Sequence, residues 1–273
     1  MKSYVFISGA TGGLGRSYVI DAAGRGWDLF LSDIPGSPLK ELASEVSTRF
    51  NVDIQYLEGS FLSQEKRDDF FLRLRQSGFR FHFLINVAGI EYETPFKDLA
   101  LSQIRQIMNV NMNGTVELTS VLLKQRSKSD VFRILTVSSL SYFYPMPYKA
   151  AYSATKRFLY HFFTAIREEL RDENVTVTLL CPAGMPTKQI VRDRINAQGF
   201  MGKITSVNPE SVAHQSINCT LAAVEEYIPG VINRLLRFAG SFVKEPGRAR
   251  ILKKRWDKAS HETSYQGVSE SLR

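Results

Sequence analysis

The sequence predicts an α/β protein in which helices flank a doubly wound parallel sheet. Three observations lead to this prediction. Short apolar runs alternate with amphipathic segments as far as Leu180, which is typical of repeated strand–helix units. A glycine-rich turn follows the first apolar run. No linker or internal repeat interrupts the alternation, which favours a single domain.

Six apolar runs have the length and composition of buried strands, and the segments between them have helical spacing. After Pro182 the regularity ends, so residues 183–207 are expected to form a long loop that acts as a substrate lid. Asn208 and Pro209 then predict the start of a helix that runs to about Ala223. The strands are predicted at residues 4–7, 29–31, 52–57, 83–85, 131–137 and 175–180.

Composition excludes several protein classes. The 273 residues are 44% hydrophobic and 23% charged, which argues against collagen-like, low-complexity and wholly disordered chains. No apolar run approaches the ~20 residues of a membrane-spanning helix, and no signal-peptide pattern begins the chain, so we expect a cytoplasmic protein. Two cysteines and four scattered histidines lack disulfide-framework and metal-ligand spacing, and no metal site is predicted.

The net charge of +8 is concentrated near the C-terminus. Nine Lys/Arg and two acidic residues lie between Arg234 and Lys258, so the rest of the chain is nearly neutral. No nucleic-acid recognition motif accompanies these charges, and no nucleic-acid partner is expected.

Gly9, Gly13 and Gly15 lie where the first predicted strand meets the first predicted helix. At such a junction the first glycine permits a tight turn, the second lets the backbone approach a pyrophosphate, and the third allows close helix–strand packing. The helix N-terminus supplies N–H donors and the positive end of its dipole to the phosphates. The alternative is a merely flexible loop.

Asp33 ends the second predicted strand, 18 residues after Gly15. This spacing fits the carboxylate that accepts hydrogen bonds from the adenosine ribose, and its charge repels a 2′-phosphate. The sequence thus favours NAD, while Arg16 and Lys40 leave NADP open. The alternative is that Asp33 caps the turn before Pro35.

Tyr152 and Lys156 are four residues apart, so on a helix they share one face. A nearby ammonium favours the phenolate, and we expect Lys156 to lower the pKa of Tyr152 towards the range of a general acid/base. Ser139 follows a buried predicted strand, thirteen residues earlier, where its hydroxyl would project at the carboxyl edge of the sheet. Ligands of open parallel sheets bind at this edge.

Together these motifs resemble the short-chain dehydrogenase/reductase superfamily over most of the chain, to about residue 240. The resemblance rests on GATGGLG at 9–15, NVAG at 86–89, NVNMNGT at 109–115, Ser139, Tyr152-x-x-x-Lys156 and PAGMPT at 182–187. It implies a Rossmann-type domain that binds NAD or NADP and moves a hydride between this cofactor and a secondary alcohol or ketone.

The resemblance also assigns roles to a tetrad of Asn111, Ser139, Tyr152 and Lys156. Tyr152 would exchange a proton with the substrate oxygen, which Ser139 would polarise. Lys156 would bind the nicotinamide ribose, and Asn111 would hold a water that links Lys156 to solvent. Asn109 and Asn113 are rival candidates for this last role, and a kinked mid-helix Asn111 is the structural alternative.

The cofactor contacts that the motifs and the resemblance imply cover both halves of the predicted sheet. Three positions depart from the usual pattern, where Val87, Ser60 and Ala183 replace an asparagine, an acid and a glycine. We therefore expect an active enzyme whose cofactor contacts are somewhat altered. The implied cofactor-binding residues are Gly9, Thr11, Gly13, Leu14, Gly15, Asp33, Asn86, Ala88, Gly89, Tyr152, Lys156, Pro182 and Thr187.

Residues 142–148 (YFYPMPY) suggest an apolar substrate, in the hydroxysteroid or 3-oxoacyl range. Alternatively, these aromatic residues pack under the lid or in a subunit contact. A non-catalytic dinucleotide-binding scaffold or redox sensor is the second function class, and the complete tetrad argues against it. The resemblance further implies a homodimer or homotetramer formed through the helices of Asn111 and Tyr152.

The C-terminal region, 231–273, is expected to extend the domain formed by residues 1–230. Apolar residues in 231–243 recur on one helical face, and a basic run with Trp256 follows. One hypothesis is a helix packed on the domain or on a neighbouring subunit, with a solvated tail that is disordered after Ser260. The other is peripheral contact of residues 231–258 with an anionic membrane surface.

Overall fold

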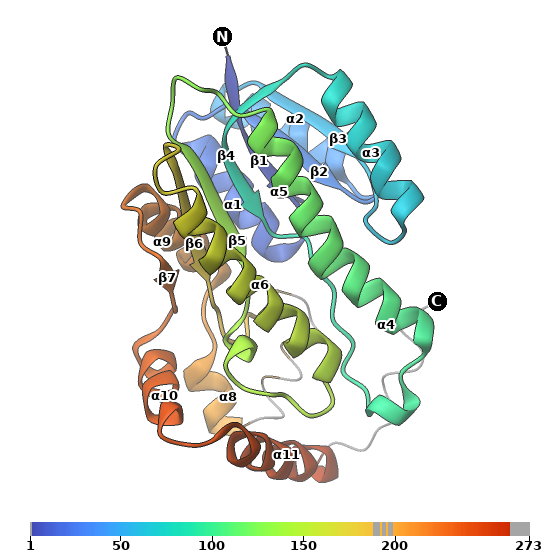
Figure 1. The fold of residues 1–273 in the computed structure, drawn as a ribbon, viewed down its shortest axis with the longest axis vertical. Coiled ribbons are helices and arrows are strands. Elements are labelled where there is room, and N and C mark those ends of the chain that lie inside the picture. Colours follow the sequence, from blue (N-terminus) through green and yellow to red (C-terminus); the bar gives the residue numbers. More distant parts are fainter. Residues whose placement is uncertain (1, 188–191, 193–194, 196–198, 263–273) are drawn as a thin grey trace.

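The computed structural model describes residues 2–187, 192, 195 and 199–262, and its centre is one parallel sheet (Figure 1). Seven strands pair in the order β3-β2-β1-β4-β5-β6-β7, which confirms the predicted doubly wound arrangement. The strands are β1 (Ser3–Ser8), β2 (Leu29–Asp33), β3 (Ile54–Glu58), β4 (Arg80–Asn86), β5 (Phe132–Val137), β6 (Val175–Leu180) and β7 (Glu226–Tyr227).

Helices cover both faces of the sheet because successive strand residues point to opposite sides. In β1, Tyr4 and Phe6 pack with α3, α5 and α6, whereas Val5 and Ile7 pack with α1, α2 and α9. The helices are α1 (Gly13–Gly24), α2 (Leu39–Phe50), α3 (Gln64–Gln76), α4 (Leu101–Met108), α5 (Thr115–Lys124), α6 (Ala150–Glu169), α8 (Gly199–Thr205), α9 (Pro209–Leu221), α10 (Val231–Ser241) and α11 (Glu245–Glu262).

The sheet changes winding direction at β1, which lies between β2 and β4. The chain leaves β1 for α1 and β2 on one side, and β4 begins the other half. A crevice therefore opens beyond the carboxyl ends of β1 and β4, where open α/β sheets bind their ligands.

Three sequence predictions require correction. The two-residue strand β7 was not predicted, because Glu226–Tyr227 is too short to show alternation. The expected loop at 183–207 contains a helix, α8, although residues 188–191, 193–194 and 196–198 lie outside the described residues. The expected solvated tail is instead helical over Glu245–Glu262, and residues 263–273, where disorder was predicted, also lie outside the described residues.

The helix predicted after residue 208 is confirmed, and its start is as expected. Asn208 Oδ1 accepts hydrogen bonds from the backbone N–H groups of Glu210 (2.8 Å) and Ser211 (3.2 Å), and Pro209 is the first helical residue. Among the described residues, no helix combines the length and the apolar character needed to cross a bilayer.

Candidate active site

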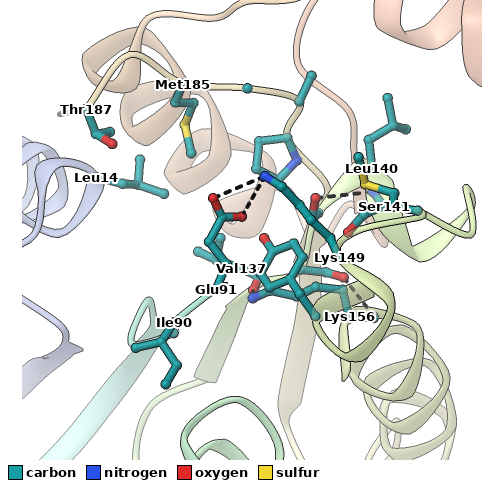
Figure 2. Close-up of a pocket in the computed structure, with 18 of the residues that line it drawn as sticks. Leu14, Ile90, Glu91, Val137, Leu140, Ser141, Lys149, Lys156, Met185 and Thr187 are labelled. Carbon is teal, nitrogen blue, oxygen red and sulfur yellow. Dashed lines mark hydrogen bonds and ion pairs between the residues drawn. The ribbon is translucent and has the colours of Figure 1, made fainter. Parts of the chain in front are cut away.

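A cavity of about 1130 Å³ occupies the crevice at the carboxyl edge of the sheet (Figure 2). It extends from the glycine-rich turn after β1, past the end of β5 and the start of α6, to α10 and α11. All the predicted site residues line it except Asn86 and Asn111. Those that line it are Gly9, Thr11, Gly13, Leu14, Gly15, Asp33, Ala88, Gly89, Ser139, Tyr152, Lys156, Pro182 and Thr187.

The turn between β1 and α1 has no room for side chains at two of its glycines. Gly9 has φ +67°, and a Cβ there would lie 2.9 Å from the backbone nitrogen of Ala88. A Cβ on Gly15 would lie 1.9 Å from the Gly9 carbonyl oxygen. The helix α1 begins at Gly13 with no side-chain cap and no acidic residue in its first turn. This N-terminus fits a pyrophosphate, which could accept hydrogen bonds from its backbone N–H groups.

Asp33 ends β2 and lines the cavity beside this turn. Its Oδ2 accepts hydrogen bonds from the Thr11 backbone N–H (2.8 Å) and the Thr11 hydroxyl (2.6 Å). The carboxylate thus holds the glycine-rich turn in place and brings negative charge to the cavity wall. Arg16 points elsewhere, since its guanidinium pairs with Glu45 at 2.8 Å.

Tyr152 and Lys156 lie one turn apart on α6, as their spacing predicts. Lys156 Nζ is 5.6 Å from the centre of the Tyr152 ring and donates a hydrogen bond to the Val137 carbonyl oxygen at 2.8 Å. Ser139 follows β5, and its Oγ accepts a hydrogen bond from the Ser141 N–H at 3.1 Å. Figure 2 shows Lys156 close to Val137, the last residue of β5.

The pKa of Tyr152 does not move in the direction that its spacing from Lys156 predicted. Burial of the phenol raises its pKa well above the ordinary value, and the negative charge of Glu91 adds to this, while the Ser139 hydroxyl acts in the opposite direction. Burial also lowers the pKa of Lys156 to about 8. Desolvation is the largest cause of both shifts, because it disfavours the charged form of each group.

Asn111 lies in a π-helical turn, Asn109–Gly114, between α4 and α5. Its side chain is fully buried and forms two hydrogen bonds with the backbone of Ile90, to the N–H at 2.8 Å and to the C=O at 3.0 Å. A Cβ on Gly89 would lie 3.4 Å from Asn111 Oδ1 and 3.6 Å from Lys156 Nζ, so both atoms border one small space. Asn111 Nδ2 also donates a hydrogen bond to the Thr155 hydroxyl at 3.1 Å, which joins the π-helical turn to α6 next to Lys156.

The side chain of Asn86 supports the sheet rather than the cavity wall. Its Nδ2 donates to the hydroxyls of Thr119 (3.1 Å) and Thr136 (3.2 Å), which joins β4 to α5 and β5. Asn86 is buried, and it acts on the cavity through the residues 87–89 that follow it. The sequence could not distinguish this role from direct contact.

Sequence reasoning missed an ion-pair cluster beside Tyr152. Lys149 Nζ lies 3.2 Å from Glu91 and 3.0 Å from Glu93, and Figure 2 shows its pairing with Glu91. Both Glu91 and Lys149 line the cavity. Their positions gave a signal, since Glu91 comes two residues after Gly89 and Lys149 directly precedes α6.

The segment at 142–148 is divided between the core, the cavity wall and a contact with α11. Tyr142 is buried and stacks on Tyr160 with ring centres 3.9 Å apart, whereas Tyr144 and Met146 line the cavity. Tyr148 donates a hydrogen bond to Asp257 of α11. The segment thus packs in the core at one end and forms cavity wall and helix contacts at the other.

The C-terminal helices close one end of the cavity, which the sequence did not predict. Trp256 Nε1 donates a hydrogen bond to Glu93 at 2.9 Å, and the Tyr144 hydroxyl donates to the Leu236 carbonyl oxygen at 2.6 Å. These contacts confirm that the helix at 231–241 packs on the domain. Its cavity-lining residues, with those of α11, are Asn233, Leu236, Ala239, Gly240, Val243, Arg248, Ile251, Leu252, Arg255 and Trp256.

Comparisons with known proteins identify the family. The family model for "short chain dehydrogenase" matches residues 3–197. A very-long-chain 3-oxoacyl-CoA reductase of Bos taurus is 29% identical over 192 residues, 69% of this chain and 61% of the bovine protein. The same-named protein of Kluyveromyces lactis is 31% identical over 185 residues, 65% of this chain and 54% of that protein. The chain therefore spans little more than half of these relatives.

A solved structure described as a study of 7beta-hydroxysteroid dehydrogenase stereoselectivity has the same fold. It superposes with a TM-score of 0.82 at 18% identity and covers 92% of this chain and 96% of that one. The family model covers residues 3–197, which is more than half of the chain. This chain belongs to the short-chain dehydrogenase family.

Proposed function

We propose that this protein is an NAD(P)-dependent reductase of an apolar ketone; the same residues would serve the reverse oxidation of the secondary alcohol. The proposal rests on one observation: Ser139, Tyr152 and Lys156 line the same cavity as the uncapped N-terminus of α1, and Asn111 is buried next to Gly89 of its wall. A candidate proton donor and a candidate phosphate-binding turn thus border one cavity.

In the proposed reaction, residues of the protein transfer the proton to the substrate oxygen. A bound nicotinamide would supply the hydride. Ser139 hydrogen-bonds the substrate oxygen, and Tyr152 donates a proton to it as negative charge develops there. In this proposal Lys156, one helical turn from Tyr152 and with Asn111 nearby, restores the proton of Tyr152 after turnover.

The protonated state of Tyr152 at neutral pH fits the reductive direction. A phenol that keeps its proton at neutral pH is set to donate it to a carbonyl oxygen, whereas oxidation needs the phenolate. The names of the two relatives described above also support the reductive direction, since both are called reductases.

An apolar substrate is supported by the lining of the cavity around Tyr152. Leu140, Tyr144, Met146 and Leu236 contribute to this part, and α10 and α11 close it. The curated relatives are named for very-long-chain 3-oxoacyl-CoA, which lies in the class we propose, a ketone on an extended apolar chain or ring system.

NADH is the proposed preferred cofactor. The Asp33 carboxylate, held by Thr11, faces the part of the cavity next to the glycine-rich turn and disfavours a 2′-phosphate there. Arg16, which could compensate that charge, is engaged by Glu45.

The test is a fluorescence titration of the protein with NADH and NADPH, followed by turnover of 3-oxoacyl thioesters, steroid ketones and small ketones. We expect tighter binding of NADH and faster turnover of the extended apolar ketones. Binding of neither nucleotide would refute the proposal, and preference for NADPH would refute the role of Asp33.

We also propose that the protein forms a homodimer or homotetramer through the helices around Asn111 and Tyr152. Support comes from exposed apolar residues on α4, namely Leu101 and Met108. Analytical ultracentrifugation of the wild type and of a Leu101→Ser/Met108→Ser variant tests this. A monomeric wild type would refute it.

A further inference from the structure

Helix α10 has two faces of different character. The inner face carries Asn233, Leu236 and Gly240, which line the cavity. Asn233 Nδ2 donates hydrogen bonds to the carbonyl oxygens of Thr205 (3.0 Å) and Pro229 (2.8 Å), so this face is fixed to the domain. With about 3.6 residues per turn, the residues on the opposite side point away from the protein.

That outer face bears an apolar stripe, Val231, Leu235, Phe238 and Phe242, spaced by four, three and four residues. Their exposed fractions are 61%, 61%, 65% and 78%. The rings of Phe238 and Phe242 meet edge to face with centres 5.3 Å apart, yet both remain open to solvent. A stripe of this size on a protein surface marks an interaction site.

The neighbouring helices extend the same surface. Phe200 of α8, which contacts α10, is 77% exposed. Figure 1 shows α8, α10 and α11 together at the end of the molecule opposite the N-terminus. The stripe therefore lies on a helix at one end of the protein.

The charge beside the stripe is strongly positive. Residues 231–257 contain eight Lys/Arg and two acidic residues. Both acids have cationic partners, Glu245 with Arg157 at 3.1 Å and Asp257 with Lys253 at 2.7 Å. The exposed basic residues that remain complement a negatively charged partner, and they are Arg234, Lys244, Arg250 and Lys254.

We propose that the α10 stripe and the basic residues of α10 and α11 dock on an anionic lipid bilayer. An apolar helix face flanked by Lys and Arg is the pattern of helices that lie in the headgroup region, where the apolar residues enter the acyl boundary. A second copy of this chain fits less well, because the same basic residues would face each other. The docking goes beyond the proposed function and does not depend on it.

Point variants test the docking better than truncation, because α10 and α11 also close the cavity. The full-length protein is sedimented with phosphatidylcholine vesicles, with or without phosphatidylglycerol. Phe238→Ser/Phe242→Ser removes the exposed aromatic pair, and Arg250→Gln/Lys254→Gln removes two charges of α11. The matched controls on α3 are Leu72→Ser and Lys66→Gln/Arg75→Gln, all at exposed positions remote from α10.

We expect the wild type to bind only the vesicles that contain phosphatidylglycerol. The charge variant should bind them about 25-fold more weakly, at about fivefold per charge, and high salt should have the same effect. The aromatic variant should lose at least about tenfold. The α3 controls should bind as the wild type does, and thermal unfolding of every variant should match that of the wild type.

Two results would overturn the proposal. One is equal sedimentation with and without phosphatidylglycerol, or none with either. The other is a wild type that self-associates, with loss of the association in the aromatic variant and no binding to vesicles, which would assign the stripe to a second copy. Neither result depends on catalysis, so the vesicle experiments test the docking proposal without testing the proposed function.

Discussion

Replacing Lys156 with methionine is expected to stabilise the fold while it abolishes turnover. The Lys156 side chain is buried, and its ammonium has one backbone partner, the carbonyl oxygen of Val137. Burial lowers the pKa of Lys156 from 10.5 to about 8. Folding therefore takes a charged group out of water at neutral pH, and a methionine of similar length avoids this penalty.

The pKa difference gives the size of the effect. At about 1.36 kcal/mol per pKa unit, the lowering from 10.5 to about 8 corresponds to about 3 kcal/mol of lost stability at pH 7. Loss of the hydrogen bond to Val137 offsets about 1 kcal/mol of this. Lys156→Met should thus raise the free energy of unfolding by about 2 kcal/mol at pH 7.

The sign of this difference depends on pH. Below about pH 8 Lys156 is protonated in both states, and the full penalty applies. Between about 8 and 10.5 the folded protein releases the proton while the unfolded chain retains it, so the wild type gains stability relative to the variant. Above 10.5 the penalty is absent, and the wild type should be more stable by about 1 kcal/mol.

Urea unfolding of both proteins at several pH values measures this difference. All other ionisable groups are common to the two proteins, so their contributions to the pH dependence of unfolding largely cancel in the difference. Lys66→Met, at an exposed position on α3, is the control and should show no comparable pH dependence. If Lys156→Met is less stable than the wild type at pH 7, or if their difference stays constant across the pH range, burial of the Lys156 ammonium does not destabilise the fold.

Three further predictions concern the cavity. Gly15→Ala would place a Cβ 1.9 Å from a backbone oxygen, so nucleotide binding should weaken at least about tenfold in a fluorescence titration; unchanged affinity would contradict the packing argument. Asn111→Leu should cost about 2 kcal/mol in urea unfolding, because it leaves both backbone groups of Ile90 unpaired; a neutral effect would contradict this. Glu91→Gln should shift the alkaline limb of the turnover profile to lower pH, because the Glu91 charge raises the pKa of Tyr152; a shift to higher pH would count against it.

Local patterns predicted the central part of the fold. Apolar runs predicted six of the seven strands, although β3 at the sheet edge is only partly buried, and the four-residue spacing placed Tyr152 and Lys156 on one helix face. The position of Ser139 at the sheet edge followed from the strand before it. These features depend on periodicity and on turn chemistry, which are local properties of a sequence.

The parts that could not be predicted depend on long-range packing. The pKa of Tyr152 is raised chiefly by burial, which the spacing of two residues does not reveal. Asn86 matched a cofactor motif, yet its amide joins Thr119 and Thr136. The basic C-terminal run was interpreted from its charge, whereas Leu252 and Trp256 within it close the cavity, since a few apolar positions decide which face packs.

We propose that Tyr152 delivers the proton to the substrate oxygen. The most direct measurement compares ketone turnover by Tyr152→Phe with turnover by Tyr160→Phe, the same substitution on the same helix at a residue that stacks on Tyr142. We expect Tyr152→Phe to bind the nicotinamide cofactor normally but to reduce the ketone about 10²–10⁴-fold more slowly than the wild type. The turnover rate of Tyr160→Phe should stay near that of the wild type. Turnover by Tyr152→Phe near the wild-type rate would show that another group supplies the proton.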